Sequence, residues 1–123
     1  MNGTNLSGDH LAGFNGNAVT LQGATLVATD LSGSTITSGS NLEDANLTGA
    51  NHSNSTEAEV SLIGANLTNA NLTNANFDDA ALDDANLTGA TITGATFVVA
   101  SFSDTICPNG TTTITSPQTL ADC

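Results

Sequence analysis

Carboxylates are the most numerous reactive groups of this chain, which has twelve Asp and Glu residues but only two histidines and two cysteines. Asp78, Asp79, Asp83 and Asp84 lie close together in the sequence, and oxygen-rich clusters of this kind suit Ca²⁺. Asp79, Asp83 and Asp84 are therefore weak candidates for metal ligands. No EF-hand or nonapeptide spacing surrounds them, so we expect a solvated acidic face without a bound metal or cofactor.

The remaining reactive residues do not form a catalytic set. His52 and Glu57 could bind a metal or a polar ligand together, but two ligands are too few to define a metal site. No pairing of a nucleophile with a base is visible, and the chain has no Lys or Arg that could stabilise an anion. The same absence of cations disfavours direct binding to nucleic acid. The sequence therefore predicts a protein that is not an enzyme.

Repeats of five residues must position these groups. In each pentad a large apolar residue, here called the centre, lies two positions after a small residue that is usually Ala. The pattern covers residues 4–38 and 40–104, with one extra residue near Gly39. In the most regular part the centres are Leu62, Leu67, Leu72, Phe77, Leu82, Leu87, Ile92, Phe97 and Phe102. A fixed period of this length determines the architecture of the whole chain.

A period of five fits neither an α-helix nor a straight strand. At about 100° per residue, five residues of helix turn about 500°, which would scatter the centres around the helix. A strand alternates its side chains with a period of two, so an odd repeat would reverse the centre each time. Both conflicts disappear if the chain bends once per pentad, with Gly, Asn or Asp at the corner, because these residues tolerate unusual backbone angles.

The string A-[NDT]-[LF]-[ST]-[GND] resembles the repeats of the pentapeptide-repeat proteins over residues 4–104. The resemblance implies an all-β fold, a right-handed quadrilateral β-helix of about five coils with four pentapeptides in each. With layers about 4.8 Å apart, such a β-solenoid would be a rod roughly 24 Å tall. We expect this solenoid over residues 1–105 and a non-repeat tail over residues 106–123.

Two places break the pattern. Gly16 takes a centre position and Phe14 the small-residue position before it, which predicts that the Phe14 ring fills the space left by Gly16. In the second break the frame places His52 and Glu57 at centres. Because an unpaired buried charge is costly, we expect residues 51–59 to bulge outward as a loop or a distorted corner.

Asn-Leu-Thr triplets give the outer surface two interpretations. The triplets fit the N-x-[ST] acceptor pattern for N-glycosylation, although the repeat itself generates most of them. With twenty residues per coil, Asn46, Asn66 and Asn86 would form one ladder, and Thr48, Thr68 and Thr88 a second ladder beside it. Such ladders can form hydrogen bonds along a stack of layers. The glycosylation candidates are Asn46, Asn66, Asn71, Asn86 and Asn109.

The tail contains both cysteines of the chain, Cys107 and Cys123. We expect a disulfide between them that closes the tail over the last coil, and closing a loop of this size stabilises by about 3 kcal/mol in the entropy model. A disulfide and the glycosylation pattern favour an extracellular or cell-surface location. No signal peptide is visible in the first twenty residues, and no apolar run approaches the roughly 18 residues of a membrane helix.

No helical or polar cap precedes the first repeat, so the first coil would present unpaired backbone groups to another chain. The sequence therefore favours a non-enzymatic structural protein that stacks head to tail into filaments, with itself or another protein as partner. The net charge of −12 opposes such stacking through repulsion. One alternative, which the family resemblance implies, is an acidic DNA mimic that binds a type II topoisomerase. A further alternative is ice binding through the Thr ladders.

Overall fold

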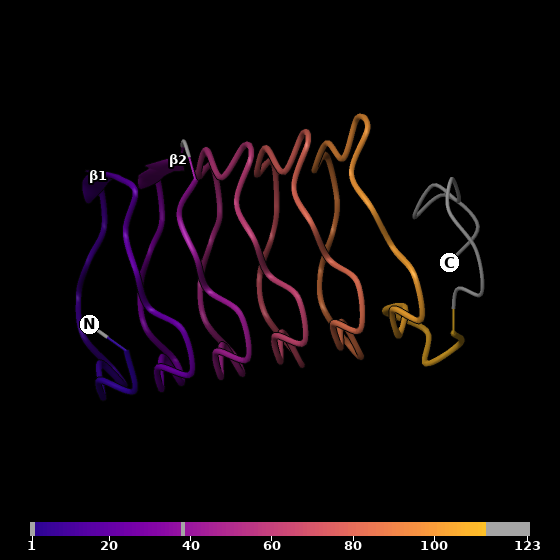
Figure 1. The fold of residues 1–123 in the computed structure, drawn as a ribbon, viewed down its shortest axis with the longest axis horizontal. Coiled ribbons are helices and arrows are strands. Elements are labelled where there is room, and N and C mark those ends of the chain that lie inside the picture. Colours follow the sequence, from indigo (N-terminus) through magenta and orange to yellow (C-terminus); the bar gives the residue numbers. More distant parts are fainter. Residues whose placement is uncertain (1, 38, 113–123) are drawn as a thin grey trace.

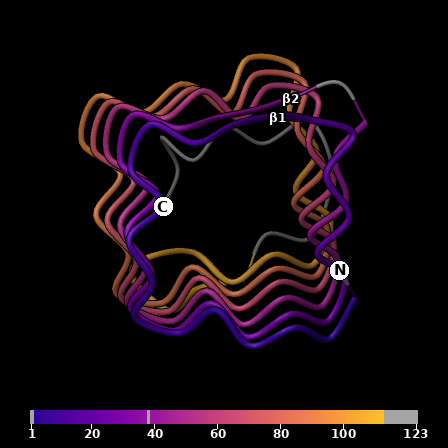
Figure 2. The ribbon, with the colours of Figure 1, turned by 90° about the vertical axis from the view of Figure 1, so that its left-hand side faces the viewer.

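The computed structural model describes residues 2–37 and 39–112, in which the chain winds as successive four-sided coils (Figures 1 and 2). Two short strands, β1 (Asn15–Asn17) and β2 (Thr35–Thr37), pair in parallel. Elsewhere the coils are joined by parallel bridges of single residues. The view along the axis shows the coils superimposed as a square outline (Figure 2). The all-β, four-sided β-helix that the sequence predicts is the observed fold.

The bridges repeat along the chain with the spacing that the sequence predicts. One ladder runs from Asn5 to Thr25, and then through Asn46, Asn66 and Asn86 to Ile106. Paired residues are twenty apart on either side of Gly39 and twenty-one apart across it, as for Thr25 and Asn46. The extra residue predicted near Gly39 is therefore confirmed, and it is accommodated without loss of the ladder.

Each side of the coil is identified below by the centres stacked along it. Side A carries Leu26, Leu47, Leu67 and Leu87, and side B carries Leu31, His52, Leu72 and Ile92. Side C carries Ile36, Glu57, Phe77 and Phe97, and side D carries Leu42, Leu62, Leu82 and Phe102.

The same backbone hydrogen bonds recur in each pentad and explain why five residues form one side. The amide of Leu62 donates to the Ala81 carbonyl of the next coil (2.7 Å), and the amide of Gly64 donates to that of Asp83 (2.9 Å). The corner position, two after each centre, has a positive φ, which is 68° at Gly64. Gly, Asn and Asp occupy most of these corners, because they enter the left-handed region at low cost. The predicted corner position is confirmed.

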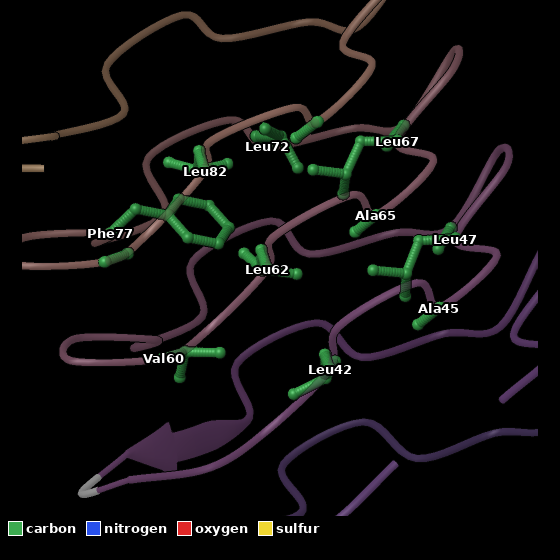
Figure 3. Packing of buried hydrophobic residues seen from close by; sticks show 14 of the residues in the cluster. Leu42, Ala45, Leu47, Val60, Leu62, Ala65, Leu67, Leu72, Phe77 and Leu82 are labelled. Carbon is green, nitrogen blue, oxygen red and sulfur yellow. The ribbon is translucent and has the colours of Figure 1, made fainter. Parts of the chain in front are cut away.

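Apolar side chains fill the inside of the coils. Leu42, Leu62 and Leu82, one from each of three successive coils, point into the interior (Figure 3), and all three are completely buried. The small residues two positions before the centres are also buried, such as Ala45 before Leu47 and Ala65 before Leu67. Inward centres and inward small residues thus form the single core of the rod.

The first predicted break is confirmed. A β-carbon added at Gly16 would lie 2.7 Å from the Phe14 ring and 2.5 Å from a Val19 methyl group. Phe14 packs against the core. The ring therefore occupies the space that the missing side chain at Gly16 leaves open.

The outward bulge expected at residues 51–59 is wrong. The amides of His52 and Glu57 donate to the carbonyls of Asn71 (2.8 Å) and Asn76 (2.7 Å), as the amides of centres do in every other interior coil. Both side chains are completely buried. The physical reason is that the two side chains bind each other, with 2.5 Å between His52 Nδ1 and Glu57 Oε1, so neither is buried as an isolated charge.

The repeat extends beyond the boundary expected at residue 106. The Ile106 amide donates to the Ala85 carbonyl (2.8 Å), and the Pro108 carbonyl accepts from Gly89 (2.8 Å). Thr105 and Cys107 take the buried small and centre positions of this further pentad. Cys107 is disulfide-bonded, but its predicted partner Cys123 lies outside the described residues. The pairing of these two cysteines therefore stays a prediction.

Candidate functional site

The acidic residues gather on two adjacent sides of the rod. Side C carries Glu59, Asp78 and Asp79 on its outer surface, and side D carries Glu43, Asp44, Asp83, Asp84 and Asp104. Side B carries Asp30, and Asp9 precedes its first centre. Among the described residues, side A carries no carboxylate. Sides C and D therefore form a strongly acidic half of the rod, whereas sides A and B carry few carboxylates.

Carboxylates of side D accept hydrogen bonds from neighbouring hydroxyl and amide groups. Asp83 accepts hydrogen bonds from the Ser101 hydroxyl (2.6 Å) and the Ser103 amide (2.7 Å). Asp79 and Asp84 lie at corners with φ of 59°. No cluster of three or more acidic, His or Cys residues suited to a metal occurs in residues 2–37 and 39–112. Of the three weak metal candidates, Asp83 thus lies on the flat outer surface of side D, and Asp79 and Asp84 lie at corners. All three add negative charge to the surface of the rod.

Asp30 is the carboxylate with the clearest change in proton affinity. Hydrogen bonds from the Ser32 hydroxyl and then from the Ser32 amide lower the pKa of Asp30 below its ordinary value of 3.8. Asn51 of the next coil adds a bond of 3.1 Å and His10 a favourable charge interaction, both in the same direction, while desolvation opposes them. The ionised carboxylate therefore connects two coils on side B.

The predicted Asn and Thr rows exist on side A, but their hydrogen bonds run within each pentad. Asn46, Asn66 and Asn86 are bridged to one another in register. Asn66 Oδ1 accepts from both the amide and the hydroxyl of Thr68, at 3.1 and 2.6 Å. The Asn46–Thr48 and Asn86–Thr88 pairs repeat this arrangement. Each Asn thus fixes the local turn of its own side.

Side B combines bonds within the pentad and bonds along the stack. Asn71 accepts from the amide and hydroxyl of Thr73, and its own amide group donates to Asn51 of the coil below at 3.1 Å. Asn51 donates in turn to Asp30. Of the predicted sequons, Asn109 is exposed whereas Asn71 is partly buried. Glycosylation of these sites stays a prediction.

Within residues 39–112, the edge of the last coil on sides B and C is unpaired. The amides of Ile92, Gly94, Phe97 and Val99 donate to no acceptor among the residues that the structure describes. Ile92 and Phe97, which are centres, are only half-buried, whereas the centres of the inner coils are fully buried. This edge therefore offers hydrogen-bond donors beside incompletely covered apolar side chains.

The first coil presents the opposite edge. Within the described chain, the amide of His10 has no acceptor, and the carbonyls of His10 and Ala12 accept no backbone bond. Leu11, the centre between them, is half-buried and packs against the core. The two ends of the rod thus carry complementary sets of donors and acceptors.

The buried pair of His52 and Glu57 forms a polar site inside the rod, where the sequence predicts an outward bulge. The two residues are consecutive centres on adjacent sides of one coil, and Ser55 Oγ donates to the same Glu57 oxygen at 2.9 Å. The sequence signal for this pair is an acidic and a basic residue at two consecutive centres, which indicates that the two side chains can bind each other. Five residues of separation bring the two side chains together inside the same coil.

Comparison with known proteins supports the repeat. Residues 61–97 match the family model for pentapeptide repeats, in eight copies. No curated protein matches the chain in sequence. No helix in the part of the chain that the structure describes is long and apolar enough to cross a membrane.

Several solved pentapeptide-repeat structures are similar to this one. HetL, from the cyanobacterium Nostoc sp. strain PCC 7120 and involved in heterocyst differentiation regulation, is 25% identical over 90% of this chain, with a TM-score of 0.44. The chain spans 62% of the length of HetL. Rfr23 from Cyanothece 51142 is 27% identical over 80% of this chain and 84% of its own, with a TM-score of 0.49. The fluoroquinolone resistance protein QnrB1 is 15% identical over 85% of this chain and 57% of its own, with a TM-score of 0.42.

Proposed function

We propose that this chain, whose residues 61–97 match the family model for pentapeptide repeats, is a non-enzymatic structural member of that family, a rod that stacks head to tail with further copies of itself. We place it outside the cell or at the cell surface. The proposal includes the right-handed sense and the roughly five coils that the family resemblance implies. The ladder from Asn5 to Ile106 contains five bridges between successive coils, which supports that number.

The open edge at Ile92 and Gly94 is the observation that carries the proposal. Inside the rod, the amide of each centre and the amide two residues later donate to carbonyls of the next coil, as at Leu62 and Gly64. If the second copy is turned by one side, its first pentad follows on side B and does not overlap the pentad at Cys107. The same pattern would then pair the amides of Ile92 and Gly94 with the carbonyls of Asn5 and Ser7 in that copy. The Asn5 amide of that copy would donate to the Ala90 carbonyl. An added coil would also cover Ile92, so the contact gains both hydrogen bonds and apolar burial.

The charge distribution favours contact through the ends over contact through the sides. Eight of the twelve acidic residues lie between Glu43 and Asp84. The first coil contributes only Asp9 and the last coil only Asp104. Like charges on sides C and D would repel a second rod placed alongside, whereas the two end coils bring few charges together. Salt would screen the repulsion that remains.

The extracellular location rests on the cysteines and the sequons. Cys107 is buried and disulfide-bonded, and structural disulfides persist in oxidising compartments. Asn109 is exposed in an Asn-Gly-Thr acceptor sequence. Mass spectrometry of the protein from its natural source would show a Cys107–Cys123 disulfide. Free thiols at both positions would contradict this part of the proposal.

Assembly is tested with matched charged variants. Ile92→Asp places a carboxylate in the proposed contact, whereas Thr93→Asp places the same charge on the exposed outer surface of the same side. We expect the Thr93 variant to form filaments like the unaltered chain and the Ile92 variant to remain monomeric, with circular dichroism showing that both are folded. A mixture of the Ile92→Asp and Leu6→Lys variants should assemble again, because each supplies the charge that the other lacks. Equal assembly of all variants would refute the contact.

A second candidate function is binding of a protein that recognises an acidic rod, and the gathering of carboxylates on sides C and D supports it. For the family, such a partner would be a type II topoisomerase. Inhibition of supercoiling by the unaltered chain, and its loss after Asp83→Asn and Asp84→Asn, would favour this candidate. An unchanged rate of supercoiling at a large excess of the chain would exclude it.

A further inference from the structure

The last described part of the chain is a tight hairpin, residues 106–112, which is called the terminal hairpin below. Ile106 and Thr112 form an antiparallel bridge, whereas every other bridge in the described chain is parallel. The amide of Cys107 donates to the carbonyl of Thr111 at 2.7 Å. The chain therefore reverses its direction here and returns along the edge of side A.

Gly110 allows the chain to reverse. Its φ is 84°, three residues after the centre Cys107, whereas Gly89 takes its positive φ two residues after its own centre. The amide of Gly110 donates to the Cys107 carbonyl at 2.9 Å. Asn109 Oδ1 accepts from both the amide and the hydroxyl of Thr111, at 2.9 and 2.8 Å. The turn thus comes one residue later than the corner at Gly89, and the chain returns over its own pentad instead of continuing onto side B.

The returning strand takes the place of a further coil on side A. One coil below, the amide of Leu87 donates to the Ile106 carbonyl at 2.8 Å, which is the bond that joins one coil to the next on this side. The amide of Cys107 is the next donor along the stack, and it is bonded to Thr111. Thr111 and Thr112 thus lie where an added coil would pair with side A.

A second copy at this end of the rod needs the same place. When it is turned by one side, its pentads centred on Leu6, Leu11 and Gly16 would follow on sides B, C and D. Its fourth pentad, centred on Leu21, would then reach side A above Cys107. Two backbone segments cannot fill one layer, so the fourth pentad cannot be seated while the terminal hairpin is closed.

We propose that the terminal hairpin is a reversible cap, which holds the place of a second copy's fourth pentad and thereby sets the concentration at which rods stack. This inference rests on the head-to-tail stacking proposed above and adds its regulation. The partner that displaces the cap is a second copy of this chain, because its first coil supplies both a backbone edge and an apolar centre for this layer.

The returning strand is weakly held, whereas the competing pentad gains by burial. Residues 109–112 are all exposed, so the strand covers little apolar surface, and segments of this kind open locally at low cost. The competing pentad would bring Leu21, a buried centre in its own coil, to the layer above the buried Cys107. The hairpin has the advantage of belonging to the same chain, while the second copy gains with concentration. A cap that is mostly closed lowers the apparent affinity of stacking to the fraction of molecules that are open.

The test measures the concentration of free rods that remains beside filaments, after the filaments are sedimented. Gly110→Val places a β-branched residue at φ of 84°. No described atom beyond the chain neighbours of Gly110 lies within 4 Å of the new β-carbon, so the variant acts through backbone strain and not through a clash. Strain of this kind changes the ratio of open to closed molecules by roughly 5- to 30-fold. We expect the concentration of free rods to fall by about the same factor.

Two control variants match the substitutions in the hairpin. Gly49→Val introduces the same strain at a corner of side A in the middle of the rod, where φ is 65° and the surroundings are equally open. Asn109→Ala removes the two bonds to Thr111 and should also favour stacking, whereas Asn86→Ala removes the equivalent bonds to Thr88 inside the rod. Both controls should leave the concentration of free rods unchanged, and circular dichroism shows that each variant is folded.

Hydrogen exchange follows the hairpin in the separate rod and does not depend on stacking. The amide of Cys107, which is bonded to the hairpin, should exchange faster than the amide of Leu87, which is bonded inside the rod. Gly110→Val should accelerate exchange at Cys107 and leave Leu87 unchanged. Exchange at Cys107 that does not respond to this substitution would contradict a cap that opens by itself.

The possible failures of the cap and of the stacking are distinguishable. Filaments that form in all variants beside the same concentration of free rods would overturn the cap and leave the stacking intact. A higher concentration of free rods for Gly110→Val would show that the hairpin is part of the contact, which also overturns the cap. Absence of filaments in every variant would refute the stacking itself, and the cap with it.

Discussion

Replacement of Val99 by Asn should stabilise the rod. Val99 occupies the corner of its pentad with φ of 62°, and its side chain is 80% exposed. A β-branched residue in the left-handed region costs roughly 1–2 kcal/mol, and the exposed side chain gains little burial in return. Asn occupies the equivalent corners at Asn69 and Asn74, with φ of 58° and 57°.

We expect Val99→Asn to raise the free energy of unfolding by about 1 kcal/mol, because Asn tolerates the left-handed conformation and no buried contact is lost. For a domain of this size that corresponds to about 4 °C in the melting temperature. Thermal unfolding followed by circular dichroism measures the change. Val98→Asn is the matched control, since Val98 is 62% exposed and has no positive φ, and it should change stability by less than about 0.5 kcal/mol. If Val99→Asn is no more stable than Val98→Asn, corner strain does not limit this coil.

Three other outcomes are expected. Leu67→Ala should cost about 2–5 kcal/mol in urea unfolding because Leu67 is completely buried, whereas Ile63→Ala should cost far less because Ile63 is 38% exposed. The pKa of Asp30 is lowered, chiefly by hydrogen bonds from Ser32 and then by the bond from Asn51. The ionised carboxylate therefore stabilises the fold above the ordinary pKa of 3.8, and this contribution disappears as the pH falls through the lower pKa of the folded state. Asp30→Asn should make acid unfolding less steep, and an unchanged slope would show that the bonds from Ser32 and Asn51 do not stabilise the ionised form. For the ice-binding alternative, Thr68→Val should alter thermal hysteresis if the Thr row contacts ice, and an absence of hysteresis in the unaltered chain would exclude that alternative.

The repeat made the fold predictable because the sequence specifies the inward and outward positions directly. The centre and the small residue define the inner surface, and the residues that tolerate positive φ define the corners. Even the exception at Phe14 and Gly16 followed from volume, since a large residue at one inward position compensates for a missing side chain at the other. These arguments need only the local pattern, and every coil repeats it.

The errors arose where the outcome depends on contacts between neighbouring pentads. Each pentad taken alone makes His52 and Glu57 separate buried charges, whereas consecutive centres meet inside the same coil. The pentad at Thr105 and Cys107 lacks both Ala and a large apolar centre, but a bonded Cys can serve as a small apolar residue. The Asn rows also differ in detail, because Thr68 lies two residues from Asn66 and reaches it within the same pentad.

Head-to-tail stacking is tested most directly by negative-stain electron microscopy, together with light scattering, across a series of salt and calcium concentrations. The account predicts filaments with an axial repeat close to the height of one rod, roughly 24 Å for about five layers spaced about 4.8 Å apart. Assembly should strengthen as salt screens the acidic sides. A monodisperse monomer under every condition would contradict the proposed stacking.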